Sequence, residues 1–434
     1  MATPVYAGPF GVEQAQRLLW RAGFGPRHGE AEKLAALGLD GAVDALLHPP
    51  AFAAVGPEPS DRGLPLAPDD AYGHDHLWWL DRMVRGNQPL VERMTLIWHD
   101  WFATSNQKVG SQKLMLQQNQ TMRIGALGSF RNLFLAMTED PAMLVWLDGI
   151  RNTKRAPNEN YAREMMELFS LGASNGYTEA DVREQARSLT GWTASYQQGL
   201  GLTGFAFNPL QHDTGVKTVF GQAGNFDFLD SVRLCVTHPD HPAFFVTKLW
   251  SYFVPVPPDA TTLNALVRIY VQDHQIQPVV RAILRHPQLY AGPRLVKPPV
   301  VYQAGLMRAL QSPVDGTTWM QLAAQSGQRL FYPPDVSGWD DTRWLDTSTF
   351  RARWFIAAKA LTPYRLDERV TAPRKKATDL LAAALHLFAE PSLLPTTQHA
   401  LVAFADSAQQ VANPHVVENA LRQLIAVSPE LQAA

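Results

Sequence analysis

Cysteine is almost missing from this sequence. The 434 residues contain a single one, Cys235. One cysteine can form neither an intramolecular disulfide nor a zinc site built from several thiolates. A disulfide framework and a multi-cysteine metal site are therefore excluded, and the redox compartment stays open.

Long hydrophobic runs are missing as well. No apolar stretch reaches the roughly 18 residues that a membrane-spanning helix needs. The first residues, 1–6, lack the basic segment and the apolar stretch of an export signal. The sequence as written predicts a cytoplasmic protein without a membrane span. Export to the periplasm or the cell exterior, followed by removal of a signal peptide, is the alternative.

Neither sign of charge is in excess. Lys and Arg number 38 and Asp and Glu number 40, a formal net charge of −2, which gives no long-range attraction to nucleic acid. Hydrophobic residues make up 46% and charged residues 18% of the chain, a composition typical of folded proteins. We therefore predict a folded protein with no nucleic-acid partner.

Apolar residues recur at helical spacing through most of the chain, which predicts many short helices. Between residues 193 and 225, several glycines, the alternating Phe205 and Phe207 and a group of β-branched residues indicate one or two hairpins, the only sheet expected. The segment 49–68, rich in Pro, Gly and Asp, is expected to be an ordered surface loop. The predicted fold is mainly α, a multi-helix globular body with a small β-hairpin insert around residues 193–225.

A linker is predicted near residue 365. The segment 362–376 carries two prolines and a basic run, which is typical of a connection between packed units. We therefore expect a helical core domain, residues 1–364, that includes the β insert. A C-terminal helical region, residues 365–434, is expected to pack on this core.

The clearest helix is expected over residues 159–171. Asn158 can cap its first turn, and Gly172 follows its last turn, as glycine often does. The next helix starts near residue 179, because Thr178 and Asp181 have the spacing at which a hydroxyl and a carboxylate bond reciprocally to first-turn amides.

The helix 159–171 has one polar arc, made of Asn160, Arg163, Glu164 and Glu167. Such a face is typical of a solvent-exposed amphipathic helix, and the alternative is a face that lines a pocket. Glu164 and Glu167 can together bind a divalent cation. One of them can also act as a general base, since neighbouring carboxylates push their pKa values apart. Arg163 can instead neutralise Glu167, four residues away.

Histidines supply the other candidate catalytic groups. His99 is expected at the boundary of the buried stripe of a helix, either as a hydrogen-bonded structural residue or as a metal ligand. His212 and Asp213 lie in the predicted loop of the β insert, shortly before Lys217. Loops often carry functional groups, and the alternative is a turn in which Asp213 bonds local amides. Trp339 ends a proline-rich segment that is either a packed loop or an aromatic platform for a sugar.

The segment NENYAREMMELFSLG, residues 158–172, resembles the signature of the bacterial domain of unknown function 1800. Supporting segments cover residues 18–25, 98–102, 176–182, 186–192, 212–217 and 333–339. The family usually carries a second histidine near Asp100 or Trp101, which this chain lacks. The resemblance implies a mainly helical protein, often exported and often encoded beside a partner protein of sulfatase-like or alkaline-phosphatase-like fold. It implies no established reaction.

The leading hypothesis for function is a hydrolase with a carboxylate and histidine pocket. The expected catalytic residues are Glu164, Glu167, His99, His212 and Asp213, with a divalent metal ion, if one is used, on Glu164, Glu167 and His99. A small-molecule or glycan substrate would contact Asn158, Asn160, Arg163, Lys217 and Trp339. Two alternatives stay open: a metal-dependent oxidoreductase that holds iron or copper, and a non-catalytic binding or assembly protein for a partner protein or glycan.

Overall fold

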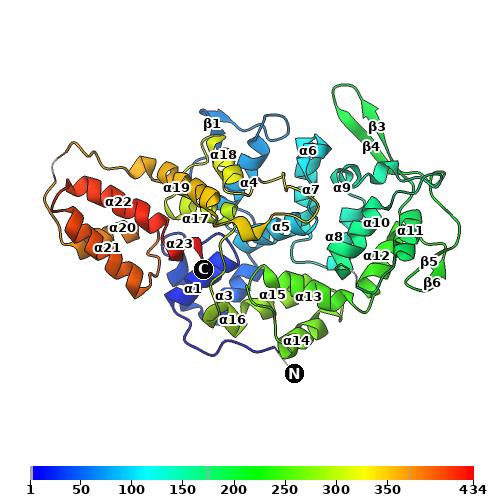
Figure 1. The fold of residues 1–434 in the computed structure, drawn as a ribbon, viewed down its shortest axis with the longest axis horizontal. Helices are drawn as coiled ribbons and strands as arrows, with labels where there is room; N and C mark the ends of the chain where they lie inside the picture. Colours follow the sequence, from blue (N-terminus) through cyan, green and yellow to red (C-terminus); the bar gives the residue numbers. More distant parts are fainter. Residues whose placement is uncertain (1–2, 174, 371) are drawn as a thin grey trace.

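The segments with helical periodicity form a long series of short helices in the computed structural model (Figure 1). The structure describes residues 3–173, 175–370 and 372–434. The sheets in the described part of the chain are three separate antiparallel pairs of strands. The predicted class, mainly α with small hairpins, is confirmed.

Residues 3–148 form nine α-helices before the signature segment. They are α1 (Val12–Arg21), α2 (Glu30–Ala36), α3 (Gly38–Leu47), α4 (His74–Arg85), α5 (Pro89–Trp101), α6 (Asn106–Val109), α7 (Gln112–Ile124), α8 (Phe130–Thr138) and α9 (Pro141–Trp146). Several starts are set by local side chains, because the side chains of Ser111, Ser129 and Asp140 each accept a hydrogen bond from a first-turn amide.

The middle of the chain begins with a short 3-10 turn, η1 (Gly149–Arg151), and continues through the signature helix and the β insert. Its helices are α10 (Glu159–Met166), continued by η2 (Glu167–Leu171), α11 (Glu179–Ser188), α12 (Phe228–Thr237), α13 (His241–Ser251), α14 (Ala260–Tyr270), α15 (Ile276–Leu284) and α16 (Pro287–Ala291). The predicted reciprocal cap of α11 is confirmed, since Thr178 and Asp181 bond each other's backbone amides.

The last part of the chain is again helical. It contains α17 (Pro299–Ala309), α18 (Thr318–Gln325), η3 (Asp341–Arg343), α19 (Thr347–Leu361), η4 (Thr362–Tyr364), α20 (Ala377–His386), α21 (Pro395–Ala408), α22 (Pro414–Ala426) and α23 (Pro429–Gln432). Helices α20, α21 and α22 lie together at one end of the molecule, beside α19 (Figure 1). Leu380 of α20 and Leu421 of α22 belong to the same hydrophobic cluster as Ile356 of α19. The boundary near residue 365 stays a prediction.

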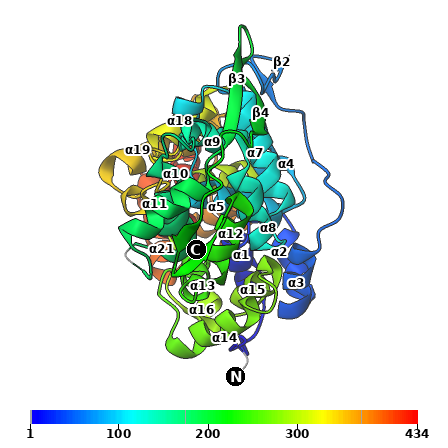
Figure 2. The same cartoon turned by 90° about the vertical axis from the view of Figure 1, so that its right-hand side faces the viewer.

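The β insert forms two hairpins. Strand β3 (Trp192–Gln197) pairs with β4 (Gly201–Phe207), and β5 (Lys217–Val219) pairs with β6 (Gln222–Gly224). The β3–β4 register shifts between Thr193 and Ser195, a bulge that bends this ribbon. The β3–β4 hairpin projects from the helical body in both views (Figures 1 and 2).

A third pair of strands lies inside the segment that was expected to be a loop. Strands β1 (Ser60–Asp61) and β2 (Leu64–Pro65) form a two-residue ladder, so the expectation that the only sheet lies at residues 193–225 was wrong. The turn between them explains the ladder. Arg62 and Gly63 both have positive φ, 51° and 78°, which is the backbone of a tight hairpin turn.

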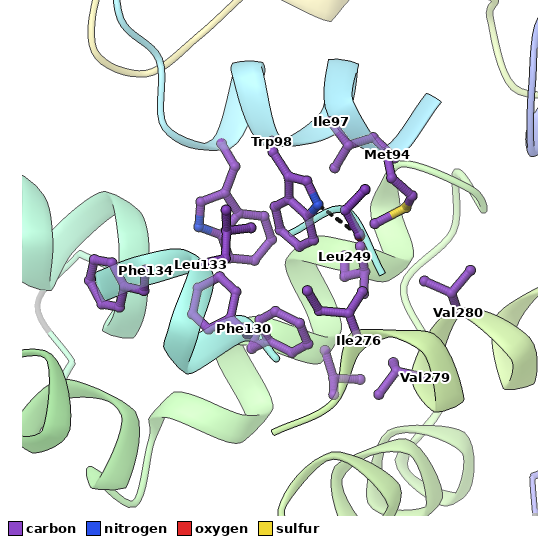
Figure 3. Packing of buried hydrophobic residues seen from close by; sticks show 14 of the residues in the cluster. Met94, Ile97, Trp98, Phe130, Leu133, Phe134, Leu249, Ile276, Val279 and Val280 are labelled. Atoms are coloured by element: carbon purple, nitrogen blue, oxygen red, sulfur yellow. Dashed lines mark hydrogen bonds between the residues drawn. The ribbon is translucent and has the colours of Figure 1, made fainter. Parts of the chain in front are cut away.

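Two hydrophobic clusters form the core. The first joins α1, α3, α5 and α8–α16, and Figure 3 shows Trp98 of α5 packed among Phe130 of α8, Leu249 of α13 and Ile276 of α15. The second joins α4, α17, α19 and the C-terminal helices. No helix in residues 3–173, 175–370 or 372–434 is long and apolar enough to cross a membrane.

Candidate functional site

The signature helix does not continue to Gly172 as one α-helix. It changes after Met166 into the wider π turn η2, and Gly172 then takes a φ of 93°, which a glycine adopts without strain. The predicted cap at the other end is confirmed, because the Asn158 side chain accepts a hydrogen bond from the Asn160 amide at 2.9 Å. Single π turns inside α-helices often mark functional sites, which makes the end of this helix a candidate region.

Side chains from other elements bond the carbonyl groups at the end of η2. Four donors take four consecutive carbonyls: Lys248 Nζ to Leu168 O at 2.9 Å, Trp101 Nε1 to Phe169 O at 3.1 Å, His241 Nδ1 to Ser170 O at 2.8 Å and Asn175 Nδ2 to Leu171 O at 3.0 Å. The last carbonyls of a helix have no partner within the helix, so these bonds satisfy them. They also fix the end of the signature helix against α5 and α13.

Lys248 is the one cation among these four donors. Its ammonium lies 4.4 Å from the ring centroid of Trp101 and 5.7 Å from that of Phe244, distances at which a cation is attracted to an aromatic face. Burial lowers the pKa of Lys248 to about 8, against the opposing effect of the nearby Asp100 carboxylate. An ammonium has three N–H donors, and a single one is used by the carbonyl of Leu168.

Asp100 is held in place by the loop that ends at Trp339. Its carboxylate accepts hydrogen bonds from the Tyr252 hydroxyl at 2.7 Å and from the Trp339 amide at 2.9 Å. Burial raises the pKa of Asp100 above its ordinary value. Gly338, with a φ of 92°, lies so close to Asp100 that a Cβ at this position would overlap the carboxylate. Only glycine lets this loop reach the end of α5.

A solvent-open hollow of about 600 Å³ lies beside Lys248. We call it the Lys248 hollow, and it is lined by Asn175, Gly176, Asp240, Ala243, Phe244, Thr247, Lys248 and Ser251. Most of this wall is the outer face of α13. None of the site residues predicted from the sequence lines it.

The polar arc of the signature helix lies elsewhere on the surface. Arg163 bonds Glu159 at 3.2 Å and Glu179 at 2.7 Å, so the expected pairing of Arg163 with Glu167 was wrong. The reason is that Glu179, at the start of α11, offers both carboxylate oxygens to the guanidinium. Glu164 is half-buried, and burial together with Glu167 raises its pKa. The two carboxylates are therefore neighbours, as expected from their spacing.

His99 is buried, which corrects its expected place at the boundary of the helix. It is 1% exposed, and its ring centroid lies within 5.3–5.6 Å of those of Trp79, Phe331 and Trp339. Its Nε2 accepts the Phe331 amide at 3.1 Å, and burial lowers its pKa to about 3. The loop after α18 covers the side of α5 that carries His99, which helical periodicity alone places at the boundary of the buried stripe. The structure thus brings His99 and Trp339 together, in a packing contact.

His212, Asp213 and Lys217 are also brought together, the first two in the turn before β5 and Lys217 at the start of that strand. His212 Nδ1 donates to Thr190 O at 2.9 Å, and Asp213 accepts from Arg187 at 2.7 Å and from the Gly215 amide at 2.8 Å. The hydrogen bond from Arg187 lowers the pKa of Asp213. This geometry matches the alternative of a turn that bonds local groups.

A three-residue metal site is not assembled by the described residues. Among them, no group of three or more His, Cys, Asp or Glu side chains is placed to hold a metal ion. Glu164, Glu167 and His99 are accordingly not gathered around one point. A catalytic role for these residues stays a prediction.

Sequence reasoning missed Lys248 and Asp100. A signal for Lys248 was present, since it is the only Asp, Glu, Lys or Arg between Asp240 and Asp259, in an otherwise aromatic and aliphatic helix. A lone cation in an apolar helix is rarely placed there by chance, because burying a charge is unfavourable. Asp100 had no comparable signal, because its partners are 152 and 239 residues away in the chain.

Comparison with known proteins gives a family but no relative of known activity. The profile described as "Protein of unknown function (DUF1800)" matches residues 17–433, nearly the whole chain. No curated protein and no solved structure matches it. The matched range includes the signature helix, the turn before β5 and the loop that holds Asp100, and the protein belongs to the DUF1800 family.

Proposed function

We propose that this protein binds an anionic small molecule or an acidic glycan in the Lys248 hollow. The observation that carries the proposal is the incomplete bonding of the Lys248 ammonium. Within the described residues it has one hydrogen bond, to Leu168 O, and no carboxylate within ion-pair distance. Two N–H donors of a half-buried cation on the wall of a hollow are therefore left for a ligand.

Asp100 does not neutralise Lys248 directly. The carboxylate is near enough to affect the pKa of the lysine, but its hydrogen bonds go to Tyr252 and to the Trp339 amide. A carboxylate or sulfate group of a ligand would supply the direct partner that is missing. Charge-assisted hydrogen bonds of this kind are about twice as strong as neutral ones.

The remaining wall fits a polar ligand with flat faces. Phe244 offers part of an aromatic ring, and Thr247, Ser251 and Asn175 offer hydroxyl and amide groups at the rim. A few polar groups around an aromatic surface are typical of small-molecule sites. Asp240, also on the rim, carries negative charge and would favour ligands whose acidic group reaches past it to Lys248.

Calorimetric titration with a uronic acid trisaccharide and a neutral trisaccharide tests this function. Lys248→Met removes the charge and keeps the length of the side chain, and Lys113→Met removes one exposed charge on α7 as a matched control. We expect the acidic sugar to bind, and Lys248→Met to weaken it at least tenfold, because a hydrogen bond to a charged group contributes about 1.5–3 kcal/mol. The proposal would be refuted if the neutral sugar bound as tightly as the acidic one, or if Lys248→Met and Lys113→Met lost the same amount of affinity for the acidic sugar.

Hydrolysis of the bound ligand is the second candidate function. It is favoured by the pKa of about 8 at Lys248, which lets this group take up or release a proton near neutral pH. Lys248→Arg separates the two functions, because arginine keeps the charge but does not lose its proton. A binding protein keeps its affinity in Lys248→Arg, whereas a hydrolase that uses Lys248 as its base loses turnover with its affinity intact.

The carboxylates of the signature helix are a separate part of the hydrolase hypothesis. Glu164 is the better candidate base of the two, since its pKa is raised by burial and by Glu167. Glu164→Gln and His212→Ala should keep the fold and lose turnover if these residues are catalytic. The oxidoreductase alternative and a sulfatase-like or alkaline-phosphatase-like partner protein remain hypotheses.

A further inference from the structure

A second cavity, of about 230 Å³, lies on another part of the molecule. Four stretches of chain form its wall: the loop before α2, the segment around Gly56, the end of α4, and the end of α17 with the residues that follow it. We call it the Arg27 cavity.

The charged side chains in this wall are basic. Arg27, Arg85 and Arg308 line the cavity together with His28, and no carboxylate does so within the described residues. Arg85 is fully bonded, to Asp81, Glu58 and the Gly56 carbonyl. Its two carboxylate partners, Asp81 and Glu58, do not line the cavity, but they compensate the charge of Arg85.

Arg308 is also fully used by the protein. Its side chain is completely buried, and it donates to the carbonyls of Gly25, Met83 and Gly86 and to Glu30. It therefore holds the N-terminal loop against the end of α4. Arg308 leaves no free hydrogen-bond donor for the cavity, and Glu30 compensates its charge.

Arg27 differs from the other two arginines. Its Nη2 donates to Val84 O at 2.8 Å and Gly86 O at 3.0 Å, while Nε and Nη1 have no hydrogen-bond partner among the described residues. Arg27 has no ion pair among the described residues, and burial together with the nearby Arg308 lowers its pKa, against the opposing effect of Glu30. A partly buried guanidinium with free donors favours an anionic partner.

Ser312 supplies a second unpartnered polar group. It is 6% exposed, and its buried hydroxyl has no hydrogen-bond partner among the described residues. A buried hydroxyl without a partner is unfavourable unless water or a ligand bonds it. The rest of the wall is apolar and includes Val55, Pro57, Val84, Met307 and Pro313.

We propose that the Arg27 cavity binds a small carboxylic acid with an apolar body, its carboxylate bonded by Arg27 and the Ser312 hydroxyl and its body packed against Met307 and Val84. The free donors of Arg27 account for the acid group. The apolar side chains account for the apolar body, and the cavity volume limits its length. This site is independent of the Lys248 hollow.

Octanoate is the probe, with 1-octanol as the uncharged compound of the same chain length. Titration is followed by calorimetry and by the ¹³C-methyl NMR signal of Met307, assigned by loss of that signal in Met307→Leu. We expect octanoate to bind and to shift the Met307 signal, and 1-octanol to bind at least tenfold more weakly. Equal binding of the alcohol, no binding of either compound, or binding that leaves the Met307 signal unmoved would overturn the proposal.

Two variants locate the site by different means. Arg27→Gln removes the cation, and Val55→Trp fills the cavity from a position that is 64% exposed, so that the core is left intact. Each is expected to weaken octanoate binding at least tenfold, while Lys248→Met leaves it unchanged. Unchanged octanoate affinity in a folded Val55→Trp variant would overturn the proposal even if Arg27→Gln fails to fold.

Discussion

Two lysines of this protein, Lys217 at the start of β5 and Lys248 on α13, have opposite bonding patterns. Lys217 is fully buried, and its ammonium donates to Asp213 O, to Asn225 Oδ1 at 3.2 Å and to Phe226 O at 2.7 Å. Lys248 is half-buried, donates to one carbonyl and faces a hollow. Both have their pKa lowered by burial, so the difference lies in the partners.

The comparison shows that the two lysines differ in the number of free N–H donors, and under the proposed function Lys248 is the one that binds a ligand. Lys217 uses all three N–H groups to tie the ends of the β5–β6 segment together, so nothing remains for a ligand. The sequence made Lys217 the candidate because it follows His212 and Asp213, and it gave Lys248 no such neighbours. The three acceptors of Lys217 leave it no free N–H group for a ligand, and its predicted role in substrate binding stays a prediction.

The largest effect is expected from Lys217→Met. The substitution leaves three oxygen acceptors in and around a buried site without a donor, and each unsatisfied group costs about 1–3 kcal/mol. We expect the free energy of unfolding to fall by about 3 kcal/mol or more, measured by urea denaturation. Lys113→Met is the control and should change it by less than about 0.5 kcal/mol. If Lys217→Met is as stable as this control, Lys217 does not have the structural role that the comparison assigns to it.

The next effect is the pH dependence of ligand affinity at the Lys248 hollow. With a pKa of about 8, Lys248 is charged below pH 8 and loses its charge above it. Affinity for an acidic ligand should be constant below pH 8 and fall by up to about tenfold per pH unit above it, since one pKa unit corresponds to 1.36 kcal/mol. Titrations between pH 6 and 10 measure this. A flat profile in the wild type would show that the binding cation is not Lys248.

The stability of Lys248→Met should change little. The substitution removes one hydrogen bond to Leu168 O and also the unfavourable burial of a charge, so we expect a change below about 1 kcal/mol at pH 7. The sign of its pH dependence is also fixed. The pKa of Lys248 is about 8 in the folded protein and 10.5 ordinarily. Between these two pH values the unfolded state binds more protons than the folded state. The contribution of Lys248 to the free energy of unfolding of the wild type therefore rises with pH. Chemical denaturation at pH 7 and pH 10 should show that Lys248→Met lacks this rise.

The smallest effect is expected from metal removal. Because no three-residue ligand group exists among the described residues, treatment with EDTA should leave the melting temperature unchanged within about 1 °C. Elemental analysis of wild type and Glu164→Ala checks the same point. A near-stoichiometric metal that is lost in Glu164→Ala would revive the metal-dependent hydrolase and oxidoreductase hypotheses and move the site to the signature helix.

Much of the fold could be predicted from local patterns. The cap at Asn158, the reciprocal cap of Thr178 and Asp181 and the glycine at 172 all act within a few residues, so the sequence shows them directly. The π turn η2 was not predictable in this way. It depends on carbonyl partners supplied by α5 and α13, which periodicity does not place.

Most of the arrangement of the candidate site could not be predicted from the sequence, for the same reason. Glu164 and Glu167 are neighbours because of helical spacing, and His212, Asp213 and Lys217 because of one turn. The burial of His99 follows from a loop more than 200 residues later in the chain, whose Phe331 amide bonds its ring. Long-range contacts of this kind leave no periodic signal.

The sequence by itself determined the helical class, the position of the β insert and the family, because these depend on local spacing and on a long matched segment. Only the tertiary structure decided which charged groups are satisfied and which are free. That distinction depends on donors and acceptors from distant segments, as at Lys217, Lys248 and Arg27. A hydrogen-bonding group becomes a binding group where the fold leaves it without a partner beside a cavity.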